Sequence, residues 1–297
     1  MPTTTYRFVT VDVFTDRRFG GNPLAVFPDA RGLSDADMKA LAAEFNLSET
    51  TFVLPPEDPA NTARVRIFTP AGEIPFAGHP NVGTGFVLAR EGRDRGGVLL
   101  FEETAGLVEV RVDRDAAGEP VGATIAAPQP LSLGPEMPAE TVAALAGIDA
   151  ADVVAGSHRP VRASMGNPFF VAEVSGGALG RAAPDLAAFR RASAERPEEN
   201  GRVALHLYAR EGERVRTRMF APLHGVVEDP ATGSANVALG GLLLSLTGDA
   251  EGRYEVTQGV EMGRPSLLGV TARRAADGVR ATVGGGCVPV LRGEAEV

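Results

Sequence analysis

The chain has 297 residues, of which 44% are hydrophobic and 23% are charged. At roughly 150 residues per domain, this length favours two domains of ordinary globular composition. A net charge of −9 argues against nucleic acid and anionic membranes as partners. With a single cysteine, Cys287, the chain has no internal disulfide, no cysteine-based zinc cluster and no paired-thiol site.

The single lysine excludes two further kinds of chemistry. Lys39 lies in an amphipathic helical pattern and does not follow a glycine loop, so there is no phosphate-binding GxxxxGK[ST] motif and little support for a Schiff-base enzyme. The first residues carry no export-type segment, and no apolar run approaches the roughly 18 residues of a membrane span. We therefore expect a cytoplasmic protein.

The first part of the chain alternates β-type runs with an amphipathic helix. Ser34 and Asp37 resemble a capping box, and Met38, Ala42 and Phe45 follow at helical spacing. Runs rich in Thr, Val and Phe predict strands at 6–14, 24–27, 50–54, 63–68, 97–101 and 107–112. These patterns indicate an α+β fold.

Two further helices are predicted where a proline follows a polar residue. The first has His79 as cap, Pro80 as first residue and Gly92 near its end. The second has Asp229 as cap and Pro230 as first residue, and its apolar residues face all sides. A helix that is apolar all round is buried, and we expect its glycines to allow close packing by surrounding strands.

Three signals recur in the same order in the two halves of the chain. Residues 21–23, Gly-Asn-Pro, recur at 166–168, an offset of 145. Phe68-Thr69-Pro70 is echoed at 220–222, and the segment beginning at His79 is echoed from Asp229, an offset of 150. The chain therefore contains two copies of one plan, each predicted to be a curved mixed sheet around a central helix.

The helix N-termini are candidate binding positions. Their free N–H groups and positive dipole ends suit a carboxylate or a developing enolate, and if the two copies face each other they share one cleft. Gly83, Gly85 and Gly233 would allow a ligand to approach the backbone, and Thr84 and Ser234 would add hydroxyls. Simple helix capping by His79 and Asp229 is the alternative.

Glu49 stands where the first helix ends and a β-type run begins. Taken alone, a glutamate at such a junction is either a solvated surface residue or a positioned side chain. The local pattern leaves both interpretations open.

Several motifs in fixed order resemble the PhzF family of phenazine biosynthesis. They are Gly21–Phe27, Asn46–Val53, Arg66–Pro70, Pro75–Pro80, Glu228–Ala235 and Gln258–Ser266. That family has the diaminopimelate-epimerase-like fold, so the resemblance implies two pseudo-symmetric α+β domains with the site in the cleft between them, usually in a homodimer. The implied domains are residues 1–125, completed by about 279–297, and residues 126–278.

The resemblance also implies an activity. In the phenazine enzymes the glutamate that matches Glu49 moves a proton between two carbons of trans-2,3-dihydro-3-hydroxyanthranilate without a cofactor, which makes this chain an expected isomerase of a small carboxylate. The matching positions are Glu49, His79 and Asp229 for catalysis, and Ser48, Gly78, Gly233 and Ser234 for substrate binding.

Two other functions remain open. His79 and Asp229 could form a two-base pair that epimerises an amino-acid-like carbon, or the chain could be a non-catalytic binding protein for small acids. Diaminopimelate epimerases carry catalytic cysteines at the two helix N-termini, where this chain has His79 and Asp229, and Cys287 stands at neither position. The four histidines have no metal-binding spacing, so we expect no metal site, and the family resemblance implies a reaction without a cofactor.

Overall fold

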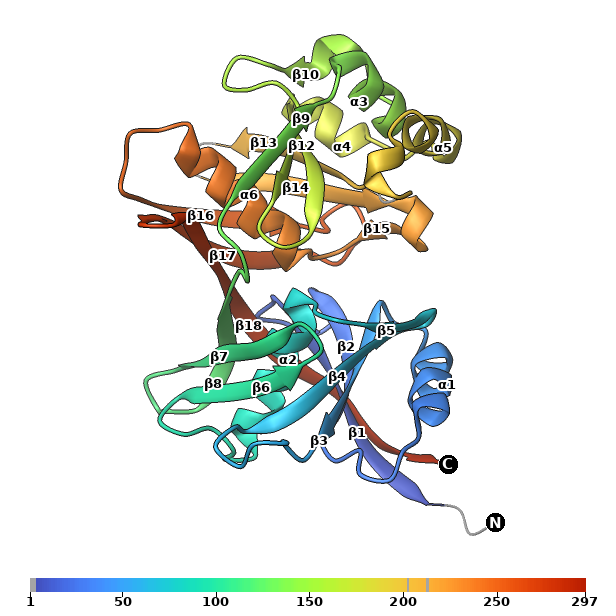
Figure 1. The fold of residues 1–297 in the computed structure, drawn as a ribbon, viewed down its shortest axis with the longest axis vertical. Helices are drawn as coiled ribbons and strands as arrows, with labels where there is room; N and C mark the ends of the chain where they lie inside the picture. The colour runs from blue at the N-terminus through green and yellow to red at the C-terminus, as the bar shows by residue number, and fades with distance from the viewer. Residues whose placement is uncertain (1–3, 202, 212–213) are drawn as a thin grey trace. The chain divides into compact units, whose positions relative to one another are not determined.

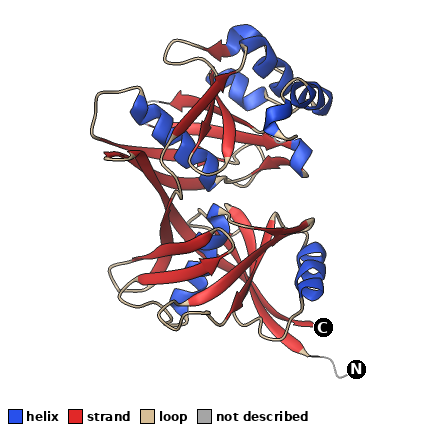
Figure 2. Cartoon of the chain, viewed as in Figure 1, coloured by secondary structure: helices blue, strands red, loops and turns tan. Residues whose placement is uncertain are grey.

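The computed structural model describes residues 4–201, 203–211 and 214–297. The chain divides into two compact units, which we describe separately. Unit 1 consists of Met1–Ala126 with Gly284–Val297, and unit 2 consists of Ala127–Val283. Both units contain more strands than helices (Figure 2).

Unit 1 is a strand ring that closes on itself. Its strands are β1 (Thr5–Val13), β2 (Asn22–Phe27), β3 (Glu49–Leu54), β4 (Ala63–Thr69), β5 (Gly72–Ile74), β6 (Val98–Glu103), β7 (Gly106–Arg114), β8 (Pro120–Ala126) and the end of β18 (Gly278–Glu296). Around the ring, β1 pairs with β2, β2 with β3, β3 with β4, β4 with β6, β6 with β7, β7 with β8, β8 with β18, and β18 with β1. The β2–β3 and β4–β6 pairs are parallel, so the sheet is mixed.

Helix α2 (Gly78–Arg90) lies inside this ring, and α1 (Asp35–Phe45) lies outside it (Figure 1). Every residue of α2 from 78 to 89 is buried. A Cβ added to Gly83 would stand 2.6 Å from Leu24 Cδ2, and one added to Gly85 would stand 2.5 Å from Val110 Cγ1. These glycines face strand side chains, so the prediction of a ligand against Gly83 and Gly85 is wrong. The close packing predicted for the glycines of the second apolar helix is confirmed at Gly240, where an added Cβ would stand 2.5 Å from Val270 Cγ1.

Unit 2 repeats the mixed pairing order. Its strands are β9 (Ser132–Glu136), β10 (Val153–Val154), β11 (Val161–Ser164), β12 (Pro168–Val174), β13 (Leu205–Glu211), β14 (Arg214–Ala221), β15 (Val226–Asp229), β16 (Glu251–Gln258), β17 (Ser266–Ala275) and the start of β18. The β12–β13 and β14–β16 pairs are parallel, as β2–β3 and β4–β6 are in unit 1. Helix α6 (Gly233–Ser245) packs against β11, β12, β16 and β17.

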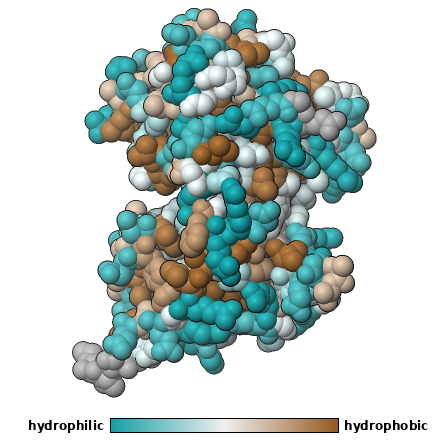
Figure 3. All heavy atoms as spheres, turned by 180° about the vertical axis from the view of Figure 1, so that it is seen from behind, coloured by the Kyte–Doolittle hydropathy of each residue, from teal (hydrophilic) through white to brown (hydrophobic). Residues whose placement is uncertain are grey.

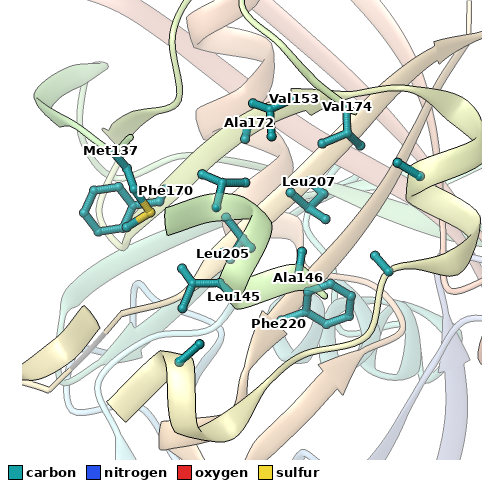
Figure 4. Close-up of a cluster of buried hydrophobic side chains, with 14 of the residues drawn as sticks. Met137, Leu145, Ala146, Val153, Phe170, Ala172, Val174, Leu205, Leu207 and Phe220 are labelled. Atoms are coloured by element: carbon teal, nitrogen blue, oxygen red, sulfur yellow. The ribbon is translucent and has the colours of Figure 1, made fainter. Parts of the chain in front are cut away.

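The remaining helices of unit 2 cover a separate apolar cluster. They are α3 (Ala139–Ala146), α4 (Gly176–Arg181), α5 (Leu186–Ala194), and the short 3₁₀ turns η1 (Ala150–Asp152), η2 (Pro197–Glu199) and η3 (Pro222–His224). Phe170, Leu205 and Phe220 of the sheet and Leu145 of α3 belong to this cluster (Figure 4). Burial of such side chains contributes roughly 1.5–3 kcal/mol each, which holds the helices on the sheet.

Unit 1 has a smaller aromatic cluster under α1. The rings of Phe27 and Phe52 stack with centroids 4.9 Å apart, and Met38 and Ala42 of α1 pack on the same cluster. The Ser34 capping box forms as predicted, with Asp37 as its partner. Hydrophilic and apolar atoms are interspersed on the face drawn in Figure 3, as is usual for a globular surface.

Both central helices begin at residues other than those predicted. Helix α2 begins at Gly78 after Ala77, so His79 is its second residue and not its cap. Helix α6 begins at Gly233 after Thr232, whereas Asp229 ends strand β15. The Asp-Pro pair therefore precedes the helix because the chain first completes a strand there.

Candidate functional site

Glu49 and His79 come together in unit 1. Glu49 begins β3, His79 lies in the first turn of α2, and Glu49 Oε2 stands 3.5 Å from His79 Nε2. The Glu49 side chain is 17% exposed and that of His79 is 6% exposed. The separation is longer than the usual N–H···O hydrogen bond of 2.7–3.2 Å, so it is a close contact that a small shift would tighten.

Burial governs the charge of His79. Desolvation lowers the pKa of this imidazole to about 3, so the ring is neutral at physiological pH. The contact with Glu49 is therefore between a carboxyl group and a neutral imidazole, not an ion pair. A neutral imidazole beside a carboxyl group can hold a heteroatom through one hydrogen bond, but it is a weak base.

Ser48 and Gly78 lie next to these two residues in the chain. The Ser48 hydroxyl donates to Asn22 Oδ1 over 3.1 Å, which ties the start of β3 to the start of β2. Gly78 is buried at the start of α2, and its cap residue Ala77 has no side chain that could accept from the first N–H groups. The helix start thus keeps the positive end of its dipole beside His79.

Asp229 belongs to a hydrogen-bonded group in unit 2. The Thr232 hydroxyl donates to Asp229 Oδ2 over 2.6 Å, and Gln258 Nε2 donates to the Asp229 carbonyl over 2.8 Å. Gln258 Oε1 in turn accepts from Asn236 Nδ2 over 2.8 Å. The backbone and the carboxylate of Asp229 are therefore both held in place before α6 begins.

Gly233 and Ser234 form the first turn of α6. Gly233 is buried, and Ser234 is partly exposed. The Thr232 hydroxyl donates to Asp229 and accepts from Gln258 Nε2, and it forms no capping hydrogen bond to the helix. The first turn of α6 therefore resembles that of α2 in lacking a side-chain cap.

The strand registers show which residues of the two units are equivalent. Thr50 pairs with Phe68 in unit 1, and Leu205 pairs with Phe220 in unit 2. Because Phe68 and Phe220 occupy the repeated Phe-x-Pro motif, Thr50 is equivalent to Leu205, an offset of 155. The residue before Thr50 is Glu49, and its counterpart is therefore Ala204.

The two central helices follow the same offset. Asn81 Nδ2 donates to the carbonyl of the cap residue of α2 over 3.0 Å, and Asn236 Nδ2 does the same in α6 over 3.0 Å. Since these asparagines are equivalent, His79 corresponds to Ser234 and not to Asp229. The predicted equivalence of His79 with Asp229 is wrong, because that alignment ignored the strand that Asp229 ends.

The counterpart of Asp229 lies in β5. Ile67 pairs with Ile74, and Met219 pairs with Asp229, so Ile74 occupies the equivalent position. Unit 1 therefore carries the glutamate and the histidine, and unit 2 carries the aspartate and the serine. The two units therefore share one backbone arrangement but carry different polar side chains.

Sequence reasoning missed the residues that support Asp229. Gln258 is fully buried within its network, and His206 Nε2 contacts Asn236 Oδ1 at 3.2 Å, with burial lowering the pKa of His206 to about 4. The available signals were the Gln-Gly motif at 258 and the spacing of four residues between Thr232 and Asn236. Both become informative only when β16 is known to end beside α6.

The remaining titratable candidates do not join these groups. Cys287 is buried, and desolvation raises the pKa of its thiol, so it lacks the thiolate character of a nucleophile. His158 Nε2 contacts the Tyr208 hydroxyl at 2.8 Å in unit 2. Across the described part of the chain, no group of three or more His, Cys, Asp or Glu side chains has a metal-binding arrangement.

Comparison with known proteins places this duplicated barrel in a class of isomerases. The family model described as "Phenazine biosynthesis-like protein" matches residues 11–293. The trans-2,3-dihydro-3-hydroxyanthranilate isomerase of Pseudomonas aeruginosa is 38% identical over 283 residues, covering 93% of this chain and 94% of that protein. The chain therefore belongs to the PhzF family, and it is an isomerase.

Solved structures share its fold. A PhzF-family phenazine biosynthesis protein of Bacillus anthracis superposes with a TM-score of 0.86 at 24% identity, covering 99% of each chain. A predicted epimerase of Pseudomonas aeruginosa superposes with a TM-score of 0.77 at 31% identity, covering 98% of this chain and 99% of that one. None of the helices in the described parts of the chain combines the length and the hydropathy of a membrane span.

Proposed function

We propose that this isomerase moves a proton between two carbons of trans-2,3-dihydro-3-hydroxyanthranilate or a related small carboxylate. Glu49 acts as general base and then as general acid, and no cofactor takes part. The contact of 3.5 Å between Glu49 and the neutral imidazole of His79 carries this proposal. The name of the relative with 38% identity supports the substrate class.

One carboxyl group is sufficient for both proton transfers of the proposed reaction. The Glu49 carboxylate takes a proton from one carbon, and the electron pair of the broken C–H bond spreads into the adjacent π-system. The resulting carboxylic acid returns that proton to a second carbon, which restores the carboxylate. A positioned acid–base group of this kind accelerates proton transfer by roughly 10²–10⁴-fold.

The other predicted residues bind and orient in this proposal. Neutral His79 holds a heteroatom of the substrate, and the N–H groups at Gly78 and Gly233, with the hydroxyls of Ser48 and Ser234, bind its polar groups. Asp229 orients the substrate or a proton on a heteroatom. The support is that Asp229 is held at both its backbone and its carboxylate, which preorganises it.

The two-base alternative draws less support from His79. A base whose pKa has fallen to about 3 through burial is a poor proton acceptor near neutrality. His79 and Asp229 also do not occupy equivalent positions in the two units, because the counterpart of His79 is Ser234.

Isotope transfer and one substitution test the proposal together. Substrate carrying deuterium at the carbon that loses its proton is converted in ordinary water, and the product is examined by NMR and mass spectrometry. A single base is expected to carry part of the deuterium to the second carbon. Glu49→Gln is expected to lower kcat at least 100-fold, whereas Glu44→Gln on the exposed side of α1 leaves it unchanged.

Three results would contradict this assignment. Full activity in Glu49→Gln would remove Glu49 from the reaction. Complete deuterium loss in every turnover, with equal dependence on His79 and Asp229, would favour the two-base epimerase. Tight binding of the carboxylate without any turnover would favour a binding protein.

We also propose that the protein is a cytoplasmic homodimer, as the family resemblance implies. Light scattering after size-exclusion chromatography measures its mass, and a mass near 31 kDa, that of the single chain, would contradict the dimer.

A further inference from the structure

Glu103 is a partly buried acid that the proposed reaction does not use. It ends β6 in unit 1, and both of its carboxyl oxygens are shielded from solvent without a hydrogen-bond partner among the described residues. The Asn81 side chain lies beside it, in a geometry short of a hydrogen bond. Desolvation raises the pKa of Glu103 to about 8, which Asn81 offsets only in part.

The duplication gives Glu103 a counterpart with known contacts. The residue before Glu103 lies opposite Arg64 in the parallel pair β4–β6. The residue before Gln258 lies opposite Arg216, the equivalent of Arg64, in the parallel pair β14–β16. Glu103 and Gln258 therefore occupy equivalent positions, just as Asn81 and Asn236 do.

Gln258 uses both functions of its amide. Its Oε1 accepts from Asn236 Nδ2 over 2.8 Å, and its Nε2 donates to the Asp229 carbonyl over 2.8 Å and to the Thr232 hydroxyl over 3.0 Å. One end of the side chain is thus an acceptor and the other a donor. This pairing joins the end of β16 to the segment that leads into α6.

A carboxyl group reproduces that pattern only when it carries a proton. An ionised carboxylate has acceptors alone, and burying it without donors is strongly unfavourable. The dipole of α2 would favour the ionised form, but no N–H group of the described residues donates to either oxygen of Glu103. A neutral acid offers one acceptor and one donor, as an amide does.

We propose that Glu103 acts as a neutral carboxylic acid in the place of Gln258. One oxygen accepts from Asn81, and the other donates toward the segment before α2. Glu103 is therefore a positioning residue for the first turn of α2, which carries His79. Its effect on catalysis rests on the proposed function, whereas its effect on the helix does not.

The turn after Glu103 and its neighbour Asn81 each form a hydrogen bond to the segment that leads into α2. Ala105 N, in the turn after Glu103, donates to the Pro75 carbonyl over 3.2 Å. Asn81 Nδ2 donates to the Ala77 carbonyl over 3.0 Å, which closes the first turn around His79. A change in the charge of Glu103 therefore acts on the segment that holds His79 near Glu49.

The charged neighbours of Glu103 are engaged elsewhere. Glu102, on the same strand, accepts from the backbone N–H groups of Glu57 and Asp58 and from the Asn61 amide. Arg64 of β4 pairs with Glu57 at 3.1 Å. These charged side chains line one groove with Glu103. His79, the titratable residue of the first turn of α2, is neutral and adds no charge near Glu103.

Thermal unfolding between pH 5 and pH 9 tests the protonation without any assay of activity. Because folding raises the pKa of Glu103, its stabilisation is complete at low pH and is lost as pH rises through about 8. The unfolding temperature of the full-length wild type is expected to fall relative to Glu103→Gln as the pH rises from 5 to about 8, and the two proteins are expected to run parallel above pH 8. Glu103→Ala is expected to unfold at a lower temperature at every pH, and Glu119→Gln, an exposed control, is expected to follow the wild type.

Activity and NMR of His79 complete the test. Glu103→Gln is expected to keep kcat within two-fold of wild type at pH 7 and to keep it above pH 8, where that of the wild type falls. Glu103→Ala is expected to lower kcat about 10-fold and to shift the ring signals of His79.

Four outcomes would separate the role of Glu103 from the proposed reaction or contradict it. Identical pH profiles of unfolding for wild type and Glu103→Gln would overturn the proposal, and so would a Glu103→Gln protein as unstable as Glu103→Ala. If Glu49→Gln stays fully active while the unfolding profiles behave as expected, the proposed reaction fails and the neutral Glu103 stands. Unshifted His79 signals in Glu103→Ala would overturn the positioning role.

Discussion

The Thr232 hydroxyl donates to Asp229 Oδ2 over 2.6 Å and accepts no hydrogen bond from the helix that follows Thr232. A threonine in this position commonly caps its own helix by accepting from the first turn. Here it holds a carboxylate ahead of the helix, and Gln258 accepts from the Thr232 N–H over 3.1 Å. The start of α6 is therefore arranged around Asp229.

Asp229→Asn separates the charge of this residue from its structural contacts. The asparagine oxygen still accepts from the Thr232 hydroxyl, so the unfolding temperature is expected to stay within a few degrees of wild type. Loss of the charge is expected to lower kcat about 100-fold if Asp229 orients the substrate, in the range typical of acid–base groups. Steady-state kinetics of both proteins at pH 7 measure the effect, and full activity in the variant would exclude a need for the charge.

His79 is expected to stay neutral down to acidic pH. Folding lowers its pKa from 6.5 to about 3, so the unfolded chain binds more protons below pH 6.5 and the free energy of unfolding falls as the pH decreases. ¹⁵N NMR of the imidazole nitrogens should show no titration above pH 5. Urea unfolding of His79→Gln should lose less stability than wild type between pH 6.5 and pH 4, and a His79 midpoint near 6.5 would contradict this expectation.

Gly83→Ala should destabilise unit 1. The added Cβ would lie 2.6 Å from Leu24 Cδ2 and 2.8 Å from Val13 Cγ2, inside the strand ring. Overpacking of this kind costs about 1–3 kcal/mol in the free energy of unfolding. Gly180→Ala is the matched control, because its Cβ meets no atom within 4 Å in helix α4 and is expected to be neutral or stabilising.

Arg218→Met should destabilise unit 2. The Arg218 guanidinium is 7% exposed, pairs with Glu228 through two hydrogen bonds of 2.7 and 2.8 Å, and donates to the carbonyls of Leu179 and Ala182. Removing one partner of a buried ion pair costs about 3–5 kcal/mol. Arg111→Met is the control.

The control is informative because Arg111 is 73% exposed in its pair with Glu109. Exposed pairs of this kind contribute about 0–1 kcal/mol. Urea unfolding in low and high salt compares the two variants. Equal effects of Arg111→Met and Arg218→Met would show that burial does not decide the contribution.

The strands and α1 could be predicted because their signals are local. Alternating residues such as Arg64, Val65 and Arg66 mark a half-buried strand, and the Ser34 capping box marks a helix start. The starts of α2 and α6 could not be placed in this way. Pro80 lies within the first turn of α2, where its missing N–H is not needed, whereas Pro230 lies between a strand and a helix.

The polar groups depend on strand register, which the sequence does not contain. A motif alignment paired His79 with Asp229, but the pairing of Met219 with Asp229 assigns Asp229 to the position of Ile74. Gln258 becomes a support for Asp229 only through pairs formed between β14 and β16. Such contacts join residues far apart in the chain, so local patterns carry no information about them.

The last strand, β18, imposes an order on synthesis. Residues 284–297 complete the ring of unit 1 by pairing with β1 and β8, but the ribosome makes them after the whole of unit 2. Unit 2 can therefore fold before the ring of unit 1 is complete. During that time β1 and β8 each lack a pairing partner on one side. Unpaired strand edges promote aggregation, so the nascent chain is most vulnerable in the interval between the synthesis of β8 and that of β18.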